Sequence, residues 1–235
     1  MKTIGLIGGM SWERTGEYYR IINETVRDRL GGLHSGKIAM VSVDFAEIEA
    51  MQMAGDWDRA GEVLAEAARR VEAAGADFVL ICTNTMHKVA DRVAAAVSIP
   101  LLHLADATAE RIVGSSGEIK SIGLLGTAFT MEQDFYRARL DAHGLSVLVP
   151  EASDRAIIHR VIYDELCLGV VNDQSRGEYE RIMGTLVDRG AEGIILGCTE
   201  IELLIDPAGP SNVPLFPTSR IHAETAVDWA LSDFS

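Results

Sequence analysis

Short apolar blocks alternate along the chain with longer amphipathic stretches. Each block is rich in Val, Ile and Leu and is bounded by Gly or Pro, as residues 4–8 illustrate. This composition is typical of a strand that is buried on both faces. Between the blocks, residues 57–74 place Ala, Val and Leu at helical spacing, with Arg and Glu on the opposite face. Strands that alternate with helices of this length predict parallel sheets and the α/β class.

Three of the apolar blocks occur twice, in the same order and at nearly constant spacing. The two copies of each block lie 114 to 118 residues apart. In the first pair, each copy follows a Lys and a small hydroxyl residue, and in the second pair each copy ends in Cys-Thr. The pairs are 4–8 with 122–126, 75–83 with 190–199, and 99–102 with 213–216.

This repeat predicts two pseudo-symmetric, doubly wound α/β domains, each with its own parallel sheet. We expect the first domain to comprise residues 1–105, completed by residues 217–235, and the second to comprise residues 106–216, with the crossing near residues 104–118. Ligands of such sheets bind beyond the carboxyl ends of the strands. The active site is therefore expected in a cleft between the two domains.

Composition removes several classes of function. The chain has 35 acidic and 21 basic residues and a net charge of -14, which disfavours nucleic acid as a partner. No apolar run approaches the ~20 residues that a membrane-spanning helix needs, and the apolar stretch near the N-terminus is too short for a signal peptide. The three cysteines are too few and too widely spaced for a disulfide framework. A cytoplasmic protein with reduced thiols is expected.

The glycine-rich loop after the first strand does not predict dinucleotide binding. Gly5-x-x-Gly8-Gly9 lacks the G-x-G-x-x-G spacing, and no acidic residue follows at the required distance. Backbone N–H groups of such a loop, together with Thr127 and Thr130 in the second half, are suited to holding a small anion at the start of a helix. A tight strand-to-helix turn without a ligand is the alternative.

Cys82 and Cys198 end corresponding blocks of the repeat, and each precedes a predicted helix. A thiol at a helix N-terminus has a lowered pKa, which makes a thiolate base available near neutral pH. One thiol on each face of an α-carbon can remove and return a proton with inversion, in either direction. Asn84, Thr85 and the loop that contains Thr127 and Thr130 are candidates for stabilising the resulting carbanion.

Other interpretations of these residues stay open. They include a disulfide, a zinc site with His87, which lacks the usual ligand spacing, and cysteine nucleophile chemistry with a histidine base, as in amidases. A two-lobed small-molecule binder or sensor is a further class. Cys167 has no counterpart and is assigned to core packing, and the remaining histidines are assigned structural or solvent-exposed positions. They are His34, His103, His143, His159 and His222.

Four segments match the motifs of a known family: IGLIGGMS (4–11), CTNTMH (82–87), LLGTAFTM (124–131) and GCTE (197–200). Over nearly its whole length, the chain resembles the aspartate/glutamate racemases. The segments RLGGLHS, MEQDFYR and ELCLG look particularly like the enterobacterial broad-specificity branch of amino-acid racemases.

The resemblance implies a two-base mechanism without pyridoxal phosphate, metal or another cofactor, with Cys82 and Cys198 as the proton carriers. It also implies an amino acid as substrate and a homodimer. Gln52, which spacing alone places in solvent, becomes a substrate contact by the resemblance, and Glu200 stands where glutamate racemases have His. The implied substrate contacts are Met10, Gln52, Thr83, Asn84, Thr85, Thr127 and Thr130.

The chain departs from strictly aspartate-specific members where those members place basic side chains against the distal carboxylate. The corresponding stretches, residues 44–48 and 164–168, contain no Arg or Lys. A dianionic substrate would lack its strongest orienting contact there. Broad specificity is therefore expected, and the alternatives are a strictly aspartate/glutamate-specific racemase, a hydantoin racemase, a maleate isomerase or an arylmalonate decarboxylase.

Overall fold

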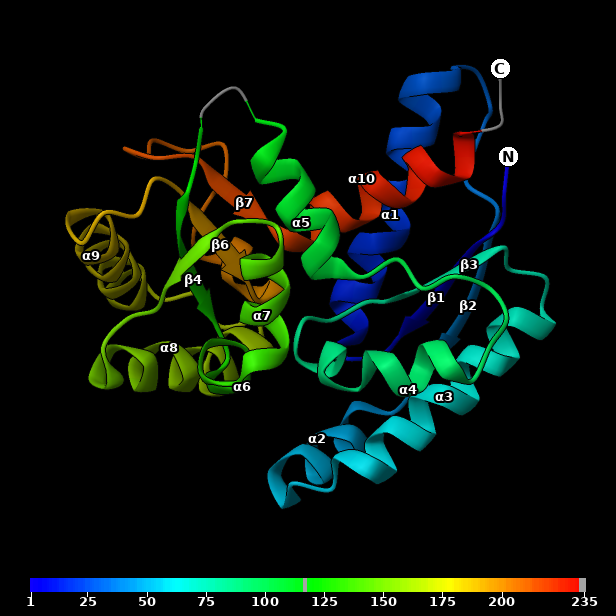
Figure 1. The fold of residues 1–235 in the computed structure, drawn as a ribbon, viewed down its shortest axis with the longest axis horizontal. Helices are drawn as coiled ribbons and strands as arrows, with labels where there is room; N and C mark the ends of the chain where they lie inside the picture. The colour runs from blue at the N-terminus through cyan, green and yellow to red at the C-terminus, as the bar shows by residue number, and fades with distance from the viewer. Residues whose placement is uncertain (116–117, 233–235) are drawn as a thin grey trace. The chain divides into compact units, whose positions relative to one another are not determined.

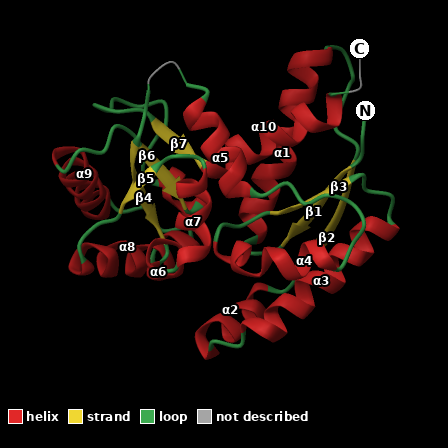
Figure 2. Cartoon of the chain, viewed as in Figure 1, coloured by secondary structure: helices red, strands yellow, loops and turns green. Residues whose placement is uncertain are grey.

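The computed structural model describes residues 1–115 and 118–232. Residues 116–117, in the expected crossing between domains, and 233–235, in the expected completion of the first domain, lie outside the described residues. The chain divides into two compact units: unit 1 comprises Met1–Leu104 with His222–Ser235, and unit 2 comprises Ala105–Ile221. Each unit contains a parallel sheet with helices packed against it, so the predicted α/β class is confirmed (Figure 2).

Unit 1 is built on a three-stranded parallel sheet in the order β2-β1-β3. Figure 1 shows α3 and α4 along one face of this sheet and α1 with α10 along the other. The strands are β1 (Ile4–Gly8), β2 (Ile38–Ser42) and β3 (Phe78–Ile81). The helices are α1 (Trp12–Leu30), α2 (Phe45–Ala54), α3 (Trp57–Ala73), the 3-10 helix η1 (Thr85–Val89), α4 (Ala90–Ala95) and, from His222 onwards, α10 (Thr218–Leu231).

Unit 2 is built on a four-stranded parallel sheet in the order β5-β4-β6-β7. Helix α9 approaches β4 so closely that a Cβ on Gly123 would lie 3.1 Å from the Leu186 side chain. The strands are β4 (Ser121–Gly126), β5 (Ser146–Leu148), β6 (Ile194–Gly197) and β7 (Leu215–Pro217). The helices are, from Ala105 onwards, α5 (Leu104–Val113), then α6 (Ala128–Glu132), α7 (Asp134–Ala142), α8 (Ala152–Asp164), η2 (Leu166–Leu168), α9 (Asp173–Asp188) and η3 (Thr199–Leu203).

The sheet registers show where the two halves differ. Ile7 of β1 pairs with Ile81, and the corresponding Leu125 of β4 pairs with Leu196. Cys82 follows Ile81 directly, whereas Gly197 intervenes between Leu196 and Cys198. Because side chains alternate between the two faces of a strand, this extra residue means that strand register alone does not orient both thiols alike. The loops after the strands set the direction of each sulfur.

Side-chain caps fix the start of the helices that follow the strands. Asp44 accepts a hydrogen bond from the Ala46 N–H at 3.1 Å and caps α2, and Asp56 accepts one from the Arg59 N–H at 3.2 Å and caps α3. Gly55, with a φ of 71°, ends α2 in the left-handed region that favours glycine. Each cap is worth about 1 kcal/mol. The caps hold α2 at the carboxyl end of β2.

A buried histidine makes the fold sensitive to acid. His222 is fully buried, and its ring nitrogens bond to the Leu102 carbonyl at 2.9 Å and the Tyr18 hydroxyl at 3.0 Å. Burial, together with the neighbouring His87, lowers the pKa of His222 from 6.5 to about 3. Below pH 6.5 the unfolded chain takes up a proton at this ring and the folded chain does not. This stabilisation is complete above that pH and is lost as the pH falls towards about 3.

We therefore expect the free energy of unfolding to fall by up to about 1.4 kcal/mol for each pH unit below about 6. Urea unfolding at a series of pH values measures this dependence of the free energy of unfolding on pH. His222→Gln should flatten this slope, whereas His34→Asn, at an exposed loop position, should leave it unchanged. An unchanged slope in His222→Gln would show that another titrating group determines the pH dependence of stability.

Candidate active site

A glycine loop follows the central strand of unit 1. Gly9 has a φ of 95°, and a Cβ there would lie 2.1 Å from the Val43 carbonyl oxygen, so only glycine fits. The Thr15 hydroxyl accepts a hydrogen bond from the Gly9 N–H at 2.8 Å and donates one to the Ser11 carbonyl, also at 2.8 Å. The loop thereby holds the buried Met10 at the carboxyl edge of the sheet.

Cys82 lies at the same edge, directly after β3. Its N–H donates to the Ile7 carbonyl at 2.9 Å, and its side chain is fully buried. Burial raises the pKa of the Cys82 thiol well above its ordinary value. The expected lowering of the pKa by a following helix is wrong for this residue. The element that follows is a 3-10 helix of five residues, whose dipole is small beside the cost of burying a thiolate.

Cys198 follows β6 of unit 2 and is paired with a carboxylate. Its Sγ donates a hydrogen bond to Glu200 Oε2 at 3.0 Å, and the Thr199 hydroxyl donates to the same oxygen at 2.7 Å. Burial, and then the negative charge of Glu200, raises the pKa of the Cys198 thiol, so the expectation of a lowered pKa is wrong here too. Cys198 is thus held as a thiol with a proton acceptor beside it.

Gln52 is buried rather than solvated, contrary to the expectation from spacing. It lies on α2, and its Nε2 donates a hydrogen bond to Met86 Sδ at 3.1 Å. Its Oε1 is buried and, within the described residues, has no hydrogen-bond partner. Leaving a buried acceptor unsatisfied costs about 1–3 kcal/mol. Such a cost is typical of a side chain kept for binding rather than for stability.

The residues after Cys82 form a turn that is anchored by a histidine. Asn84 and Thr85 are buried, and Thr83 is half-buried. The Thr83 carbonyl bonds to His87 Nδ1 at 2.7 Å. No local pattern in the sequence indicates this contact of His87.

The corresponding loop of unit 2 is held by its own side chains. Thr127 caps α6 by accepting a hydrogen bond from the Thr130 N–H at 3.3 Å, and the two hydroxyl oxygens lie 3.2 Å apart. The Ala128 N–H donates to His159 Nδ1 at 3.1 Å. Two backbone donors that were expected to face an anion are therefore used inside the protein. The buried hydroxyls of Thr127 and Thr130 are the more suitable donors to a ligand.

The predicted residues thus form one group in each unit. Ile7 pairs with Ile81, which precedes Cys82, at the end of the unit 1 sheet, and Gly126 pairs with Gly197, which precedes Cys198, at the end of the unit 2 sheet. The group of unit 1 contains Met10, Gln52, Cys82, Thr83, Asn84 and Thr85, and the group of unit 2 contains Thr127, Thr130 and Cys198.

Among residues 1–115 and 118–232, no group of three or more His, Cys, Asp or Glu side chains is arranged to hold a metal ion. None of the helices described in the structure is long and apolar enough to cross a membrane.

A family model for Asp/Glu/hydantoin racemases matches residues 7–226 of the chain. The protein belongs to this family. It is accordingly an isomerase, as the motifs predict.

Two solved structures support the assignment to the racemases over the full length. A candidate Asp/Glu racemase from Yersinia pestis is 53% identical, with a TM-score of 0.91 over 98% of this chain and 100% of the other. An aspartate racemase homologue from Pyrococcus horikoshii OT3 is 34% identical, with a TM-score of 0.84 over 98% and 99%. The broad specificity amino-acid racemase RacX of Bacillus subtilis (strain 168) is 23% identical over 180 residues, which are 75% of each chain.

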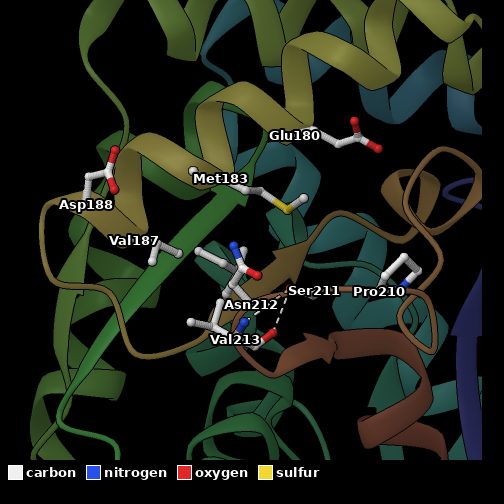
Figure 3. A pocket seen from close by; sticks show the side chains of 10 residues that line it. Glu180, Met183, Val187, Asp188, Pro210, Ser211, Asn212 and Val213 are labelled. Atoms are coloured by element: carbon white, nitrogen blue, oxygen red, sulfur yellow. Dashed lines mark hydrogen bonds between the residues drawn. The ribbon is translucent and has the colours of Figure 1, made fainter.

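Unit 2 of the racemase also contains a cavity of about 420 Å³ between α9 and residues 210–213 (Figure 3). Its lining includes Ile194, the first residue of β6, whereas Cys198 follows the last residue of that strand. The ten lining residues include no cysteine or histidine. This cavity is therefore lined by neither Cys82 nor Cys198.

Proposed function

We propose that the protein is a cofactor-independent amino-acid racemase that moves the α-proton between Cys82 and Cys198. One observation carries the proposal: each unit places a buried cysteine just beyond the sheet, next to the loop of the adjacent strand. The proposal requires each thiol to approach one face of the α-carbon of the substrate.

The surroundings of the two cysteines suggest that they differ in how readily each thiol loses or donates a proton. For Cys198 to act as base, its thiol proton passes to Glu200, and the thiolate then takes the α-proton. Burial favours the protonated form of Cys82, which suits it to donate a proton to the opposite face of the carbanion. In the reverse direction the roles exchange. The positive ammonium of a substrate favours thiolate formation at either residue.

The buried polar groups suggest how a substrate is held. Gln52 Oε1 is an acceptor suited to the α-ammonium group. The hydroxyls of Thr85, Thr127 and Thr130 and the amide of Asn84 are suited to the α-carboxylate. Donors that are fixed in a buried site stabilise the charge that develops as the α-proton leaves. Met10 and Thr83 complete the proposed contacts.

We further propose that the enzyme has broad substrate specificity. Each of the two stretches without Arg or Lys contains an acidic side chain that is already engaged: Asp44 caps α2, and Glu165 accepts hydrogen bonds from Ser175 at 2.6 Å and Arg160 at 3.3 Å. A distal carboxylate finds no basic partner in those stretches. RacX, whose curated name includes broad specificity, lends further support.

From the sequence we also propose a location, an oligomeric state and domain bounds. They are a cytoplasmic location, a homodimer, and domains that comprise residues 1–105 with 217–235 and residues 106–216.

The test is racemisation in D₂O by protein that was purified free of metal and pyridoxal phosphate. We expect enantiopure amino acids to lose optical purity with incorporation of deuterium at the α-carbon, because the protonating thiol exchanges its hydrogen with solvent. A panel of acidic, neutral polar and apolar amino acids, analysed by chiral chromatography, measures specificity. Turnover of aspartate and glutamate alone would contradict broad specificity. Binding of amino acids without any deuterium incorporation would contradict the racemase.

A further inference from the structure

Three histidines, His87, His103 and His222, pack together inside unit 1. The ring centroids of His87 and His103 are 4.5 Å apart, and those of His87 and His222 are 5.8 Å apart. Each of the three residues is at most 5% exposed. His87 and His222 form hydrogen bonds to backbone groups, and one bond of His87 reaches the turn after Cys82.

The hydrogen bonds of His87 define its tautomer. The Leu104 N–H donates to His87 Nε2 at 3.2 Å, so this nitrogen carries no proton. The proton of the neutral ring then lies on Nδ1, which donates to the Thr83 carbonyl at 2.7 Å. Thr83 directly follows Cys82 in the chain.

The contacts of His222 fix the backbone segment that bonds to His87. Its Nε2 donates to the Leu102 carbonyl at 2.9 Å, and the Leu102 N–H donates to the Val79 carbonyl of β3 at 3.0 Å. The segment from Leu102 to Leu104 is therefore fixed to the sheet on one side and to His87 on the other. Because this segment is fixed, the ring of His87 is fixed as well.

We infer that His87 is a positioning residue for the reaction: its Nδ1–H holds the Thr83 carbonyl and thereby aims the Cys82 sulfur at the α-carbon. The inference rests on the proposed function. The Cys82 N–H is bound to the Ile7 carbonyl and the Thr83 N–H to the Ile81 carbonyl, each at 2.9 Å, and the hydrogen bond from His87 to the Thr83 carbonyl fixes the next peptide of the turn. Without the bond from His87 the turn that follows Cys82 could shift, and the sulfur would shift with it. A displacement of about 1 Å at a reacting group can cost about 10²-fold in rate.

Two substitutions separate the two hydrogen bonds of His87. The amide nitrogen of asparagine replaces Nδ1, so His87→Asn keeps a donor for the Thr83 carbonyl and loses the acceptor for Leu104. The amide oxygen of glutamine replaces Nε2, so His87→Gln keeps the acceptor and loses the donor. We expect His87→Gln to lower kcat by roughly 10²-fold with KM little changed, and His87→Asn to retain most of kcat.

Thermal unfolding of both variants shows whether lost stability explains lost activity, and His34→Asn serves as a histidine substitution at an exposed position. The inference is overturned if kcat falls equally in both variants, or if it follows their melting temperatures. ¹⁵N NMR of the wild-type ring supplies a measurement that does not depend on turnover. The Nδ1–H tautomer of His87 supports the inference and the Nε2–H tautomer overturns it, whereas wild-type protein that does not racemise overturns the proposed function.

Discussion

Replacing Cys82 or Cys198 with serine is expected to reduce racemisation strongly while leaving exchange of the α-hydrogen from one enantiomer. Inversion needs a base on one face of the α-carbon and an acid on the other. With one thiol gone, the remaining thiol can still remove a proton and return a deuteron to the same face. Each variant should therefore exchange only one enantiomer, and the enantiomer should differ between the two. We expect racemisation to fall by about 10²- to 10⁴-fold.

The measurement is deuterium incorporation in D₂O, starting from each pure enantiomer, beside chiral chromatography of the product. Cys167→Ser is the matched control, because it removes the third thiol, which lies on the 3-10 helix η2 of unit 2. This variant should racemise like the parent. If Cys82→Ser and Cys198→Ser also racemise like the parent, the two-cysteine mechanism is excluded.

Glu200→Gln should lower kcat/KM by roughly 10²-fold, because glutamine cannot take the proton that Cys198 donates to Glu200. Enantiomers have equal free energies, so kcat/KM must fall by the same factor in both directions. The loss of kcat should be larger for the enantiomer whose proton Cys198 removes. Removing the negative charge also lowers the pKa of the Cys198 thiol, although burial, the larger cause of its raised value, remains.

Steady-state rates with both enantiomers and ultraviolet titration of the thiolate test these two effects. Glu202→Gln is the matched control, since Glu202 lies on the same 3-10 helix and accepts a hydrogen bond from Ser219 at 2.6 Å. It should alter neither the rate nor the titration. Unchanged kcat/KM in Glu200→Gln would show that Cys198 loses its proton by another route.

Particular residues show how far the site follows from the sequence. The positions of Cys82 and Cys198 at the ends of repeated strands follow from the apolar blocks, because burial on both faces gives these strands a recognisable composition. The acid–base properties of the two thiols do not follow. A helix after each cysteine suggests a lowered pKa, yet burial raises the pKa of both. Burial depends on all the elements around a side chain and not on its neighbours in the chain.

Gln52 and His87 illustrate the same limit. Spacing alone places Gln52 in solvent after the second strand, but packing on Met86 buries it. His87 meets Leu104, 17 residues away, and the ring of His222, 135 residues away. No local periodicity records contacts over such separations.

The sequence by itself determined the α/β class, the repeat and the family, because strand composition, glycine loops and motif spacing are local properties of the chain. Tertiary structure alone decided which polar groups are buried together. It paired Cys198 with Glu200 and left Gln52 Oε1 without a hydrogen-bond donor among the described residues. It also bonded His87 to the carbonyl of Thr83, the residue after Cys82. The physical reason is that a pKa or a hydrogen bond is fixed by desolvation and by distances between segments that only the packed fold brings together.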